Sequence, residues 1–383
     1  MMHTPSPYLL VSGDFVETGG MDRANLALAR FLAGRGDDVH LVTHRVCTSM
    51  QNKAHIIVHR VKKPLRSYFL AAPLLDSTGR RYATGIPVPP ARTLVNGGNC
   101  MAPAVNWVHY VHRAYESEVR GNPVRRAKTW AFERYARRTE RLAWARATAI
   151  IANSERTRQH LMEYFGIPSE RIHRVYYGID PERFCPPEPG QRAAQRTKLG
   201  WSQASPVVAF VGALGDRRKG FDTVFDAWSK LCGNKSWDAN LAVIGSGAEL
   251  AEWKRRAVAE TMGERIHFLG FRSDVPKVLG ACDALVAPTR YEAFGLGVQE
   301  ALSMGIPAFV SASAGVSELY PASLRNLLLP DPDDVDDLVD RLRDWRSRSA
   351  EYRDRSTQFS ASLRRWTWDS MSAQIAGIME QVA

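Results

Sequence analysis

The sequence is poor in cysteine, and its cysteines are not arranged in pairs. Five of them are spread over 383 residues without a C-x-x-C spacing: Cys47, Cys100, Cys185, Cys232 and Cys282. A disulfide framework and a structural zinc site both need closely spaced cysteines, so neither is expected. The pattern favours a reducing compartment, and we expect a cytoplasmic protein.

Long hydrophobic runs are missing as well. No stretch of about 18 apolar residues is available to span a bilayer. The N-terminus has no charged segment followed by an apolar core, so no secretory signal peptide is expected. With 45% hydrophobic and 24% charged residues, the composition is that of an ordinary globular protein. The length predicts two to three domains, each able to bury its own core.

Several catalytic spacings are absent. The ten histidines show no H-E-x-x-H or similar metal-binding spacing, and Ser154 does not lie in a G-x-S-x-G turn. These absences disfavour zinc hydrolases and α/β hydrolases. The first Gly-rich loop does not match G-x-G-x-x-G, which disfavours a nicotinamide cofactor. We expect neither a cofactor nor a required metal.

What the chain has in excess is positive charge. The formal net charge is +11 and the isoelectric point is near 9.6. This balance favours anionic partners, namely nucleotide diphosphates, acidic membrane surfaces or nucleic acid. No stacking motif accompanies the basic residues, so nucleic acid is not expected as a partner.

Short apolar runs alternate with helical patterns along the whole chain, which predicts an α/β fold with parallel sheets. Strands are expected at 7–12, 38–43, 93–95, 105–111 and 147–152, and again at 207–211, 241–244, 266–269, 284–286, 308–310 and 327–329. The Pro-rich segment 181–190 reads as a linker. We therefore expect two Rossmann-like domains, 1–185 and 200–360, facing an interdomain cleft. The final stretch 359–383 has the pattern of an amphipathic helix.

The most informative segment is 290–307. It follows an apolar run that reads as a buried strand, passes through a Gly-bearing loop and enters a helix that ends at Met304-Gly305. Two carboxylates, Glu292 and Glu300, are separated by seven residues. Open α/β sheets bind ligands at the carboxyl ends of their strands, where these carboxylates could hold sugar hydroxyls and a ribose diol. The alternative is an ordinary surface glutamate and a second one on a helix face.

Two further loops suit phosphate. Gly19 and Gly20 precede the first predicted helix, and paired glycines let the backbone approach a diphosphate; a plain strand-to-helix turn is the alternative. The second loop carries Arg217, Arg218 and Lys219 just before a helix. Cations there repel the helix dipole unless an anion binds, so they are a candidate phosphate clamp; a solvated basic loop is the alternative.

Segment 290–307 resembles the signature of retaining nucleotide-sugar glycosyltransferases of glycosyltransferase family 4, E-G-F-G-(x)4-E-A-(x)3-G-x-P. Only Ala293 departs from it, where the family prefers Gly. The resemblance runs from about residue 10 to 370 and includes the Gly-Gly loop, the basic loop and the turns near Gly245 and Phe271. It implies the GT-B architecture, an N-terminal acceptor-binding domain, a C-terminal nucleotide-sugar-binding domain, and a C-terminal helix (361–383) that crosses back to the first domain.

The resemblance also implies residue roles. Glu300 would hold the ribose, and Glu292 with the amides of Phe294, Gly295 and Leu296 would hold the sugar. Lys219 matches the family's diphosphate-binding lysine, but Ala213 stands where the family has an arginine, so Arg218 is the candidate substitute. The remaining donor-binding candidates are Gly19, Gly20 and Phe271. A histidine at the end of a strand lies near the transferred sugar in the family, and His112 fits this place better than His109.

The implied reaction moves a hexose from a UDP-sugar, or a GDP-sugar, to a hydroxyl of a glycan, glycolipid or small molecule, with retention and without a metal. The rivals are a GT-B sugar epimerase or phosphorylase and a non-enzymatic sugar-nucleotide-binding module. Asp331-Pro-Asp333 resembles the metal-binding D-x-D of another glycosyltransferase fold, but it precedes an acidic helix start, where capping explains it.

Residues 113–146 are basic and aromatic. The cations are Arg113, Arg120, Arg125, Arg126, Lys128, Arg134, Arg137, Arg138, Arg141 and Arg146, interleaved with Trp130, Phe132, Tyr135 and Trp144. Such a helix suits the anionic headgroup layer, which predicts peripheral contact with the inner face of a membrane. The alternatives are an ordinary fold helix with solvated arginines and a patch that attracts a soluble anionic acceptor.

Overall fold

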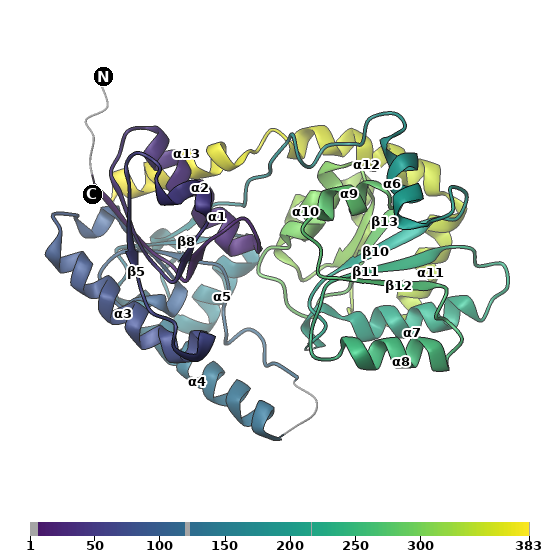
Figure 1. Ribbon diagram of the computed structural model, residues 1–383, viewed down its shortest axis with the longest axis horizontal. Coiled ribbons are helices and arrows are strands. Elements are labelled where there is room, and N and C mark those ends of the chain that lie inside the picture. Colours follow the sequence, from purple (N-terminus) through teal and green to yellow (C-terminus); the bar gives the residue numbers. More distant parts are fainter. Residues whose placement is uncertain (1–6, 119–122, 216, 383) are drawn as a thin grey trace. The chain divides into compact units, whose positions relative to one another are not determined.

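The computed structural model describes residues 7–118, 123–215 and 217–382, and the chain divides into two compact units (Figure 1). Unit 1 comprises residues 1–116, 122–178 and 367–383, and unit 2 comprises residues 117–121 and 179–366. The long segment of unit 2 begins after residue 178, so the Pro-rich segment 181–190 belongs to unit 2. Arg120, one of the cations in the basic segment, lies outside the described residues.

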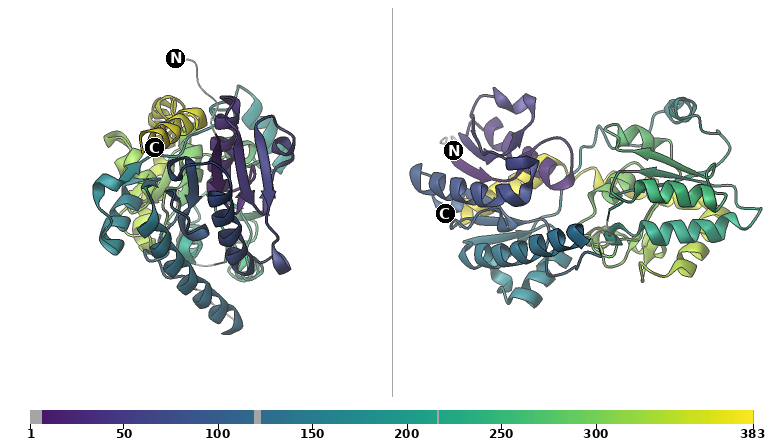
Figure 2. Two further views of the ribbon diagram at one scale, coloured as in Figure 1. Left: turned by 90° about the vertical axis from the view of Figure 1, so that its left-hand side faces the viewer. Right: turned by 60° about the horizontal axis from the view of Figure 1, so that its bottom comes forward.

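Unit 1 is built on a seven-stranded parallel sheet in the order β5-β3-β1-β6-β7-β8-β9. Most of its strands are buried from end to end because helices cover both faces of the sheet (Figure 2). The strands are β1 (Tyr8–Val11), β3 (Val39–Thr43), β5 (Ile56–Arg60), β6 (Thr93–Asn96), β7 (Val105–Val108), β8 (Ala149–Ala152) and β9 (Ile172–Arg174), with a short parallel pair β2 (Asp14–Phe15) and β4 (Arg45–Val46).

The helices of unit 1 are α1 (Gly20–Gly34), α2 (Thr48–Gln51), α3 (Tyr68–Gly85), α4 (Pro123–Arg146), α5 (Glu155–Phe165) and α13 (Trp368–Gln381), with 3-10 turns η1 (Pro64–Arg66), η2 (Pro90–Arg92), η3 (Gly97–Asn99) and η4 (Ser169–Arg171). Successive side chains of β1 point to opposite faces of the sheet. Leu9 joins the apolar cluster that includes Leu75 of α3, whereas the Tyr8 hydroxyl donates to Glu380 of α13 at 3.2 Å.

Unit 2 holds a six-stranded parallel sheet in the order β12-β11-β10-β13-β14-β15. Its strands are β10 (Val207–Val211), β11 (Asn240–Ile244), β12 (Ile266–Gly270), β13 (Ala284–Ala287), β14 (Ala308–Ser311) and β15 (Leu328–Leu329). Numbered within the unit, this order is 3-2-1-4-5-6, the arrangement of a doubly wound dinucleotide-binding sheet. The predicted α/β fold with two Rossmann-like sheets is confirmed.

The helices of unit 2 are α6 (Gln191–Leu199), α7 (Phe221–Cys232), α8 (Leu250–Ala259), α9 (Val275–Gly280), α10 (Leu296–Ser303), α11 (Val335–Ser347) and α12 (Ser349–Leu363), with 3-10 turns η5 (Arg217–Lys219), η6 (Gly315–Leu319) and η7 (Ala322–Leu327). Helices α7 and α8 cover one face, and α9, α10 and α12 the other (Figure 1). Between these layers lies one large apolar core that includes Phe225, Trp228 and Trp345.

Two expected elements differ in the structure. The strand expected at 105–111 ends at Val108, so His109 and His112 both follow the strand. The single helix expected at 359–383 is wrong: α12 ends at Leu363, and α13 begins at Trp368 with the Thr367 side chain accepting from the Ser370 N–H. The break lies where the chain returns to unit 1, in which α13 packs against α1.

Within the described parts of the chain, no helix combines the length and the apolar character needed to cross a bilayer.

Candidate functional site

In unit 2 the chain reverses its direction of winding between β10 and β13. These strands are neighbours in the sheet although two other strands separate them in sequence. Ligands of doubly wound sheets bind outside the carboxyl ends of the strands at such a point. The loops that leave β10 and β13 are the basic loop and the signature segment, so the topology brings the two predicted phosphate and sugar motifs side by side.

The two loops are held together through their backbones. The Arg218 carbonyl accepts from the Arg290 N–H at 2.8 Å and from the Thr289 hydroxyl at 2.9 Å. Gly220 has φ +69°, and a Cβ added there would lie 1.8 Å from the Pro288 carbonyl oxygen. A side chain at position 220 would therefore push the basic loop away from the signature segment.

Three predicted residues form one charged cluster at this point. The Lys219 ammonium is paired with the Glu292 carboxylate, and Arg218 Nη1 lies 4.0 Å from the same oxygen. Burial by itself raises the pKa of Glu292, but the charges of Lys219 and Arg218 and the Phe294 N–H outweigh it and hold the pKa below its usual value. Glu292 is therefore an anion, and Arg218 keeps a second contact to the Tyr291 carbonyl at 3.3 Å.

The signature helix α10 begins directly after this cluster. Its N-cap is Gly295, at φ +113°, where a Cβ would lie 2.8 Å from a methyl of Val316. Glu300 lies in the second turn of α10 and is buried. Ala293 replaces the family glycine without backbone strain, since it is not among the non-glycine residues with positive φ.

Phe271 follows β12 and is 69% exposed. The N–H of Gly245, which follows β11, donates to the carbonyl of Gly270 at 2.8 Å, so the chain near Phe271 is tied to the neighbouring strand end. Strand β12 lies two places from β10 in the sheet. The aromatic ring is thus exposed at the same sheet edge as the charged cluster, where a flat base could stack.

Unit 1 carries the remaining predicted residues. Gly19 is the N-cap of α1 with φ +80°, a conformation that favours glycine, and Gly20 is the first helical residue. Both follow β1, which is the switch strand of its sheet, next to β3 and β6. The backbone at Gly19 therefore meets the geometric requirement of an anion-binding turn.

The two histidines of unit 1 differ in environment. His112 is partly exposed, and its Nδ1 lies 2.6 Å from the buried carboxylate of Glu140 on α4. That contact sets the tautomer and leaves Nε2 without a partner among the described residues. His109 is buried, contacts the Tyr177 hydroxyl through Nδ1 and Asn96 through Nε2 at 2.7 Å, and burial lowers its pKa to about 3. Of the two, only His112 has a ring nitrogen available to a substrate.

The structure adds an acidic pair near Gly19 that sequence reasoning missed. Asp14 is buried and accepts from Arg45 at 2.9 Å and from the Tyr68 hydroxyl, while its second oxygen, Oδ1, is buried without a partner. The side chain of Asp22, in the first turn of α1, makes no hydrogen bond or ion pair with the described residues. Burial and then the Asp14 carboxylate raise the pKa of Asp22 to about 7 against the opposing charge of Arg45.

A first-turn aspartate after Gly-Gly was visible in the sequence, but an acidic residue there is usual for any helix. No local signal pairs Asp14 with residues 31 and 54 positions away. Glu140 is missed for the same reason, because it lies 28 positions from His112.

The D-x-D segment lies directly before α11, and the residue that caps this helix is Asp334, which follows the segment. Asp334 caps α11 by accepting from the Asp337 N–H at 2.9 Å, and Asp333 pairs with Arg290. Among the residues that the structure describes, no group of three or more His, Cys, Asp or Glu side chains is placed to hold a metal.

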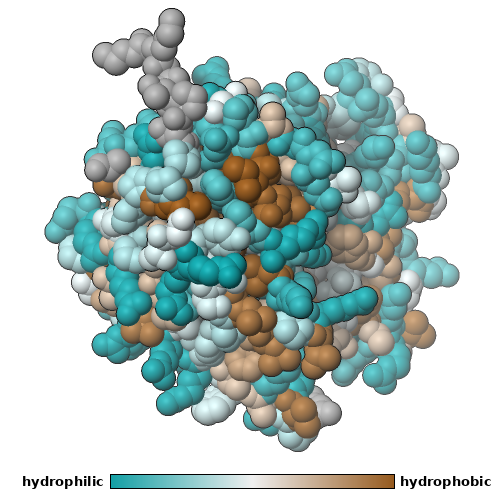
Figure 3. Space-filling model, turned by 60° about the vertical axis from the view of Figure 1, so that its left-hand side comes forward, coloured by the Kyte–Doolittle hydropathy of each residue, from teal (hydrophilic) through white to brown (hydrophobic). Residues whose placement is uncertain are grey.

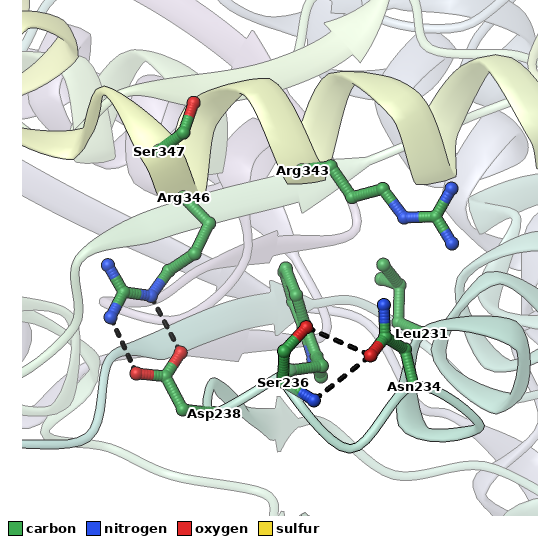
Figure 4. A pocket seen from close by; sticks show the side chains of 8 residues that line it. Leu231, Asn234, Ser236, Asp238, Arg343, Arg346 and Ser347 are labelled. Atoms are coloured by element: carbon green, nitrogen blue, oxygen red, sulfur yellow. Dashed lines mark hydrogen bonds and ion pairs between the residues drawn. The ribbon is translucent and has the colours of Figure 1, made fainter.

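A pocket of 350 Å³ in unit 2 lies away from the predicted residues. It opens between the turn after α7 and the end of α11 (Figure 4), and Arg343 and Arg346 line it together with Asp238. The Arg346 guanidinium is bound by both oxygens of Asp238, at 2.6 and 2.5 Å. The pocket is polar and nearly charge-balanced.

Each of the two units matches a family model of glycosyltransferases. Residues 191–361 match the family model described as glycosyl transferases group 1, and residues 18–183 match the one described as Glycosyltransferase Family 4.

Two relatives illustrate the range of similarity. The chain is 33% identical over 202 residues to the lipopolysaccharide core biosynthesis mannosyltransferase LpsB of Rhizobium meliloti, covering 51% of this chain and 54% of LpsB. It is 25% identical over 264 residues to the alpha-D-kanosaminyltransferase of Streptomyces kanamyceticus, covering 66% of this chain and 67% of that enzyme. The matched part thus spans about half to two thirds of the length of these curated relatives.

Solved structures share the whole architecture. Sucrose-phosphate synthase from Thermosynechococcus elongatus has a TM-score of 0.77 at 19% identity, with 99% of each chain covered. Anabaena HepE in complex with UDP-glucose has a TM-score of 0.75 at 20% identity, with 99% of this chain and 100% of HepE covered. At such identities the likeness shows the fold.

The raised pKa of Asp22 predicts a pH-dependent stability. The folded protein binds the Asp22 proton more tightly than the unfolded chain, so this contribution is present at low pH and is lost as pH rises through about 7. We expect Asp22→Asn to unfold at a higher urea midpoint than the wild type at pH 8, with an advantage that shrinks toward pH 5.

The matched control is Asp369→Asn, an exposed first-turn aspartate of α13 in the same unit. Its midpoint difference from the wild type should not grow between pH 5 and pH 8. Parallel pH profiles for Asp22→Asn and the wild type would contradict the assignment of a raised pKa.

Proposed function

We propose that this chain, which belongs to glycosyltransferase family 4 and has the GT-B fold, transfers a hexose from a nucleoside-diphosphate sugar to an acceptor hydroxyl with retention of the anomeric configuration. The observation that carries the proposal is the cluster of Arg218, Lys219 and Glu292 at the switch point of unit 2. It lies at the start of the helix that presents Glu300.

The cluster suits the charge changes of such a transfer. As the bond between the anomeric carbon and the donor oxygen breaks, negative charge develops on the departing diphosphate. Lys219 and Arg218 supply fixed positive charge, and the N-terminal amides of α10, from Gly295 and Leu296 onward, add hydrogen-bond donors. This stabilisation needs no metal, and we propose that the reaction proceeds without one.

Glu292 has two roles in this scheme. In the structure it neutralises Lys219. When the donor binds, the diphosphate takes the cations, and the Glu292 carboxylate becomes free to accept from hydroxyls of the sugar. Glu300 holds the ribose, Phe271 stacks on the base, and the amide of Phe294 donates to the sugar together with those of Gly295 and Leu296.

For the chemical step we propose front-face transfer. The acceptor oxygen bonds to the anomeric carbon on the face that the diphosphate leaves, and the acceptor proton passes to the departing phosphate oxygen. In unit 1, Gly19 and Gly20 would contact the diphosphate, and His112, held by Glu140, would donate to or accept from the transferred sugar.

Donor and acceptor classes follow from chemistry and from relatives. HepE has been solved with UDP-glucose, and a relative from Corynebacterium glutamicum is named as a GDP-mannose-dependent mannosyltransferase. We propose a UDP-sugar as donor, with a GDP-sugar as second choice, and a glycan, glycolipid or small-molecule acceptor. The relatives are named as transferases, which makes an epimerase, a phosphorylase or a binding module less favoured.

Helix α4 supports a membrane-proximal acceptor at the cytoplasmic face. It carries eight basic side chains against two glutamates, and both Trp130, at 64% exposure, and Phe132, at 38%, are exposed. Trp144 instead lies in the core, so only part of the aromatic set is available. Phe132 contacts Phe69 of α3 edge to face, which joins the patch to exposed apolar residues of α3 such as Leu70. On the face shown in Figure 3, hydrophobic side chains gather among hydrophilic ones.

Removing the positive charge of Lys219 or the proposed ribose contact of Glu300 should slow turnover. We expect Lys219→Ala and Glu300→Ala each to lower kcat/KM about a hundredfold, the scale of a lost electrostatic contact in a transition state. Diphosphate release from UDP- and GDP-sugars in the presence of acceptor measures it. Lys230→Ala on α7 and Glu252→Ala on α8 are the exposed controls and should keep wild-type rates. Wild-type turnover by either folded site variant would contradict the assignment.

Metal independence is tested directly. Turnover should persist in excess EDTA, because the cations of the basic loop do the work that a metal does elsewhere. The same diphosphate assay, with and without EDTA and then with added magnesium or manganese, checks it. Activity that disappears with the chelator and returns with either metal would refute the proposed cation clamp.

Membrane contact should be weak and salt-dependent, since each cation near an acidic surface contributes about 1 kcal/mol. We expect the protein to sediment with anionic but not neutral liposomes at low salt, and to dissociate at high salt. Trp130→Ala should weaken the binding, whereas Val258→Ala, an equally exposed apolar residue of unit 2, should not. Failure to bind either kind of vesicle at low salt would leave a soluble acceptor.

A further inference from the structure

A second pocket of unit 2 is not explained by sugar transfer. It has a volume of 320 Å³ and lies between the Pro-rich segment after residue 181, helix α6 and helix α9. None of the predicted donor residues lines it. Its connection to the signature is through Met304, the residue after α10. Helix α10 spans about 12 Å, so the pocket lies at the end of that helix opposite to Glu292.

The lining of this pocket is strongly basic. Four cations, Arg183, Arg192, Lys198 and Lys277, face one carboxylate, Glu182. Neither lysine's ammonium group makes an ion pair or hydrogen bond with the described residues. Positive charges this close together repel one another unless an anion lies between them.

Arg192 is anchored but incompletely satisfied. One of its terminal nitrogens is paired with Asp283, while its Nε is buried and has no hydrogen-bond partner in the part of the chain that the structure describes. A buried donor without a partner costs free energy unless a ligand or water accepts from it. Arg192 is also the second residue of α6, whose first-turn N–H groups add to the positive potential.

Part of the pocket lining is apolar, namely Pro187, Pro276, Gly280 and Met304, and we call this part the floor. Gly280 is buried, and a Cβ added there would lie 3.4 Å from the Met304 methyl and 3.8 Å from Pro187. Pro276 completes this floor. A ligand that fills the pocket therefore needs an anionic group for the rim and a compact organic body for the floor.

The pocket of Figure 4 provides a comparison within the same unit. It is of similar size, but Arg346 is neutralised by Asp238, and Arg343 lies 3.3 Å from Asp340. The two pockets therefore differ in how far their cations are neutralised. Both arginines of the pocket in Figure 4 have an acidic partner, whereas Lys198 and Lys277 have none among the described residues.

We propose that this pocket binds a small organic phosphate or diphosphate at a site separate from the donor site. The phosphate would lie among Arg192, Lys198 and Lys277, and its organic part would contact Met304 and Pro187. Because Met304 directly follows α10, the ligand would touch the end of the helix that carries Glu300. The proposal does not depend on the identity of the donor or acceptor.

Cys185 provides a local reporter, since it lines the pocket and is partly exposed. The rate of its alkylation by N-ethylmaleimide, followed by peptide mass spectrometry, is measured with inorganic pyrophosphate, glucose 1-phosphate, glucose, or chloride at equal ionic strength. We expect either phosphate at about four times its Kd to slow Cys185 about fivefold, because the empty fraction falls by 1 + [L]/Kd. Glucose and chloride should have no effect.

The controls separate this site from others. Cys47 and Cys232 are also partly exposed but lie outside the pocket, so their rates should not change. The double variant Lys198→Ala/Lys277→Ala should abolish protection, whereas Lys235→Ala/Lys254→Ala, with the same loss of charge on exposed residues of unit 2, should retain it. Protection should also survive in Lys219→Ala, in which the donor cluster is disabled.

Comparing the protection of Cys185 by pyrophosphate and by glucose 1-phosphate separates the contribution of the phosphate group from that of the organic body. Stronger protection by glucose 1-phosphate assigns the organic body to the apolar floor, and equal protection assigns the binding to the phosphate alone; both support the site. The proposal is overturned if neither phosphate slows Cys185, if Cys47 and Cys232 slow equally, or if protection persists in Lys198→Ala/Lys277→Ala.

Discussion

The ion pair between Lys219 and Glu292 is the contact on which the arrangement of the candidate site in unit 2 depends. It joins the loop after β10 to the loop after β13, and the carbonyl of Arg218 binds the same second loop through Thr289 and Arg290. Without the carboxylate, the cations of the basic loop would repel one another beside a helix N-terminus. In the proposed reaction, a bound diphosphate would pair with Lys219 and Arg218 in place of Glu292. The Glu292 carboxylate could then accept hydrogen bonds from the sugar hydroxyls.

Unit 1 has a comparable charged group near its Gly-Gly loop, but there the central side chains are acidic. Asp14 is held by Arg45 and Tyr68, while the Asp22 carboxyl has no partner among the described residues and a pKa raised to about 7. A neutral carboxyl beside Gly19 does not oppose an approaching phosphate, whereas an ionised one would. Glycine at positions 19, 220 and 295 is explained by backbone geometry, since each has positive φ, and at Gly220 and Gly295 a side chain would also collide with the neighbouring loop.

Prediction from sequence was most successful for the strands. The apolar runs at 207–211, 266–269 and 308–310 became β10, β12 and β14 with bounds that differ by one residue at most. Strands buried on both faces are apolar throughout, and this leaves a strong local signal. The ends of elements were predicted less well. The apolar run 105–111 continues past the strand because Val111 is buried in the core without pairing in the sheet. Segment 359–383 divides into two helices where the chain passes from unit 2 to unit 1.

By itself, the sequence determined the α/β class, the two sheets and the motifs whose members are neighbours in the chain, because apolar periodicity and short spacings are local properties. Only the tertiary structure decided which distant charges meet. Lys219 contacts Glu292, which is 73 positions away in the sequence. His112 contacts Glu140 at a separation of 28 positions, and Arg192 contacts Asp283 at a separation of 91. These pairings follow from strand order and helix packing, and the local pattern of residues does not encode either one.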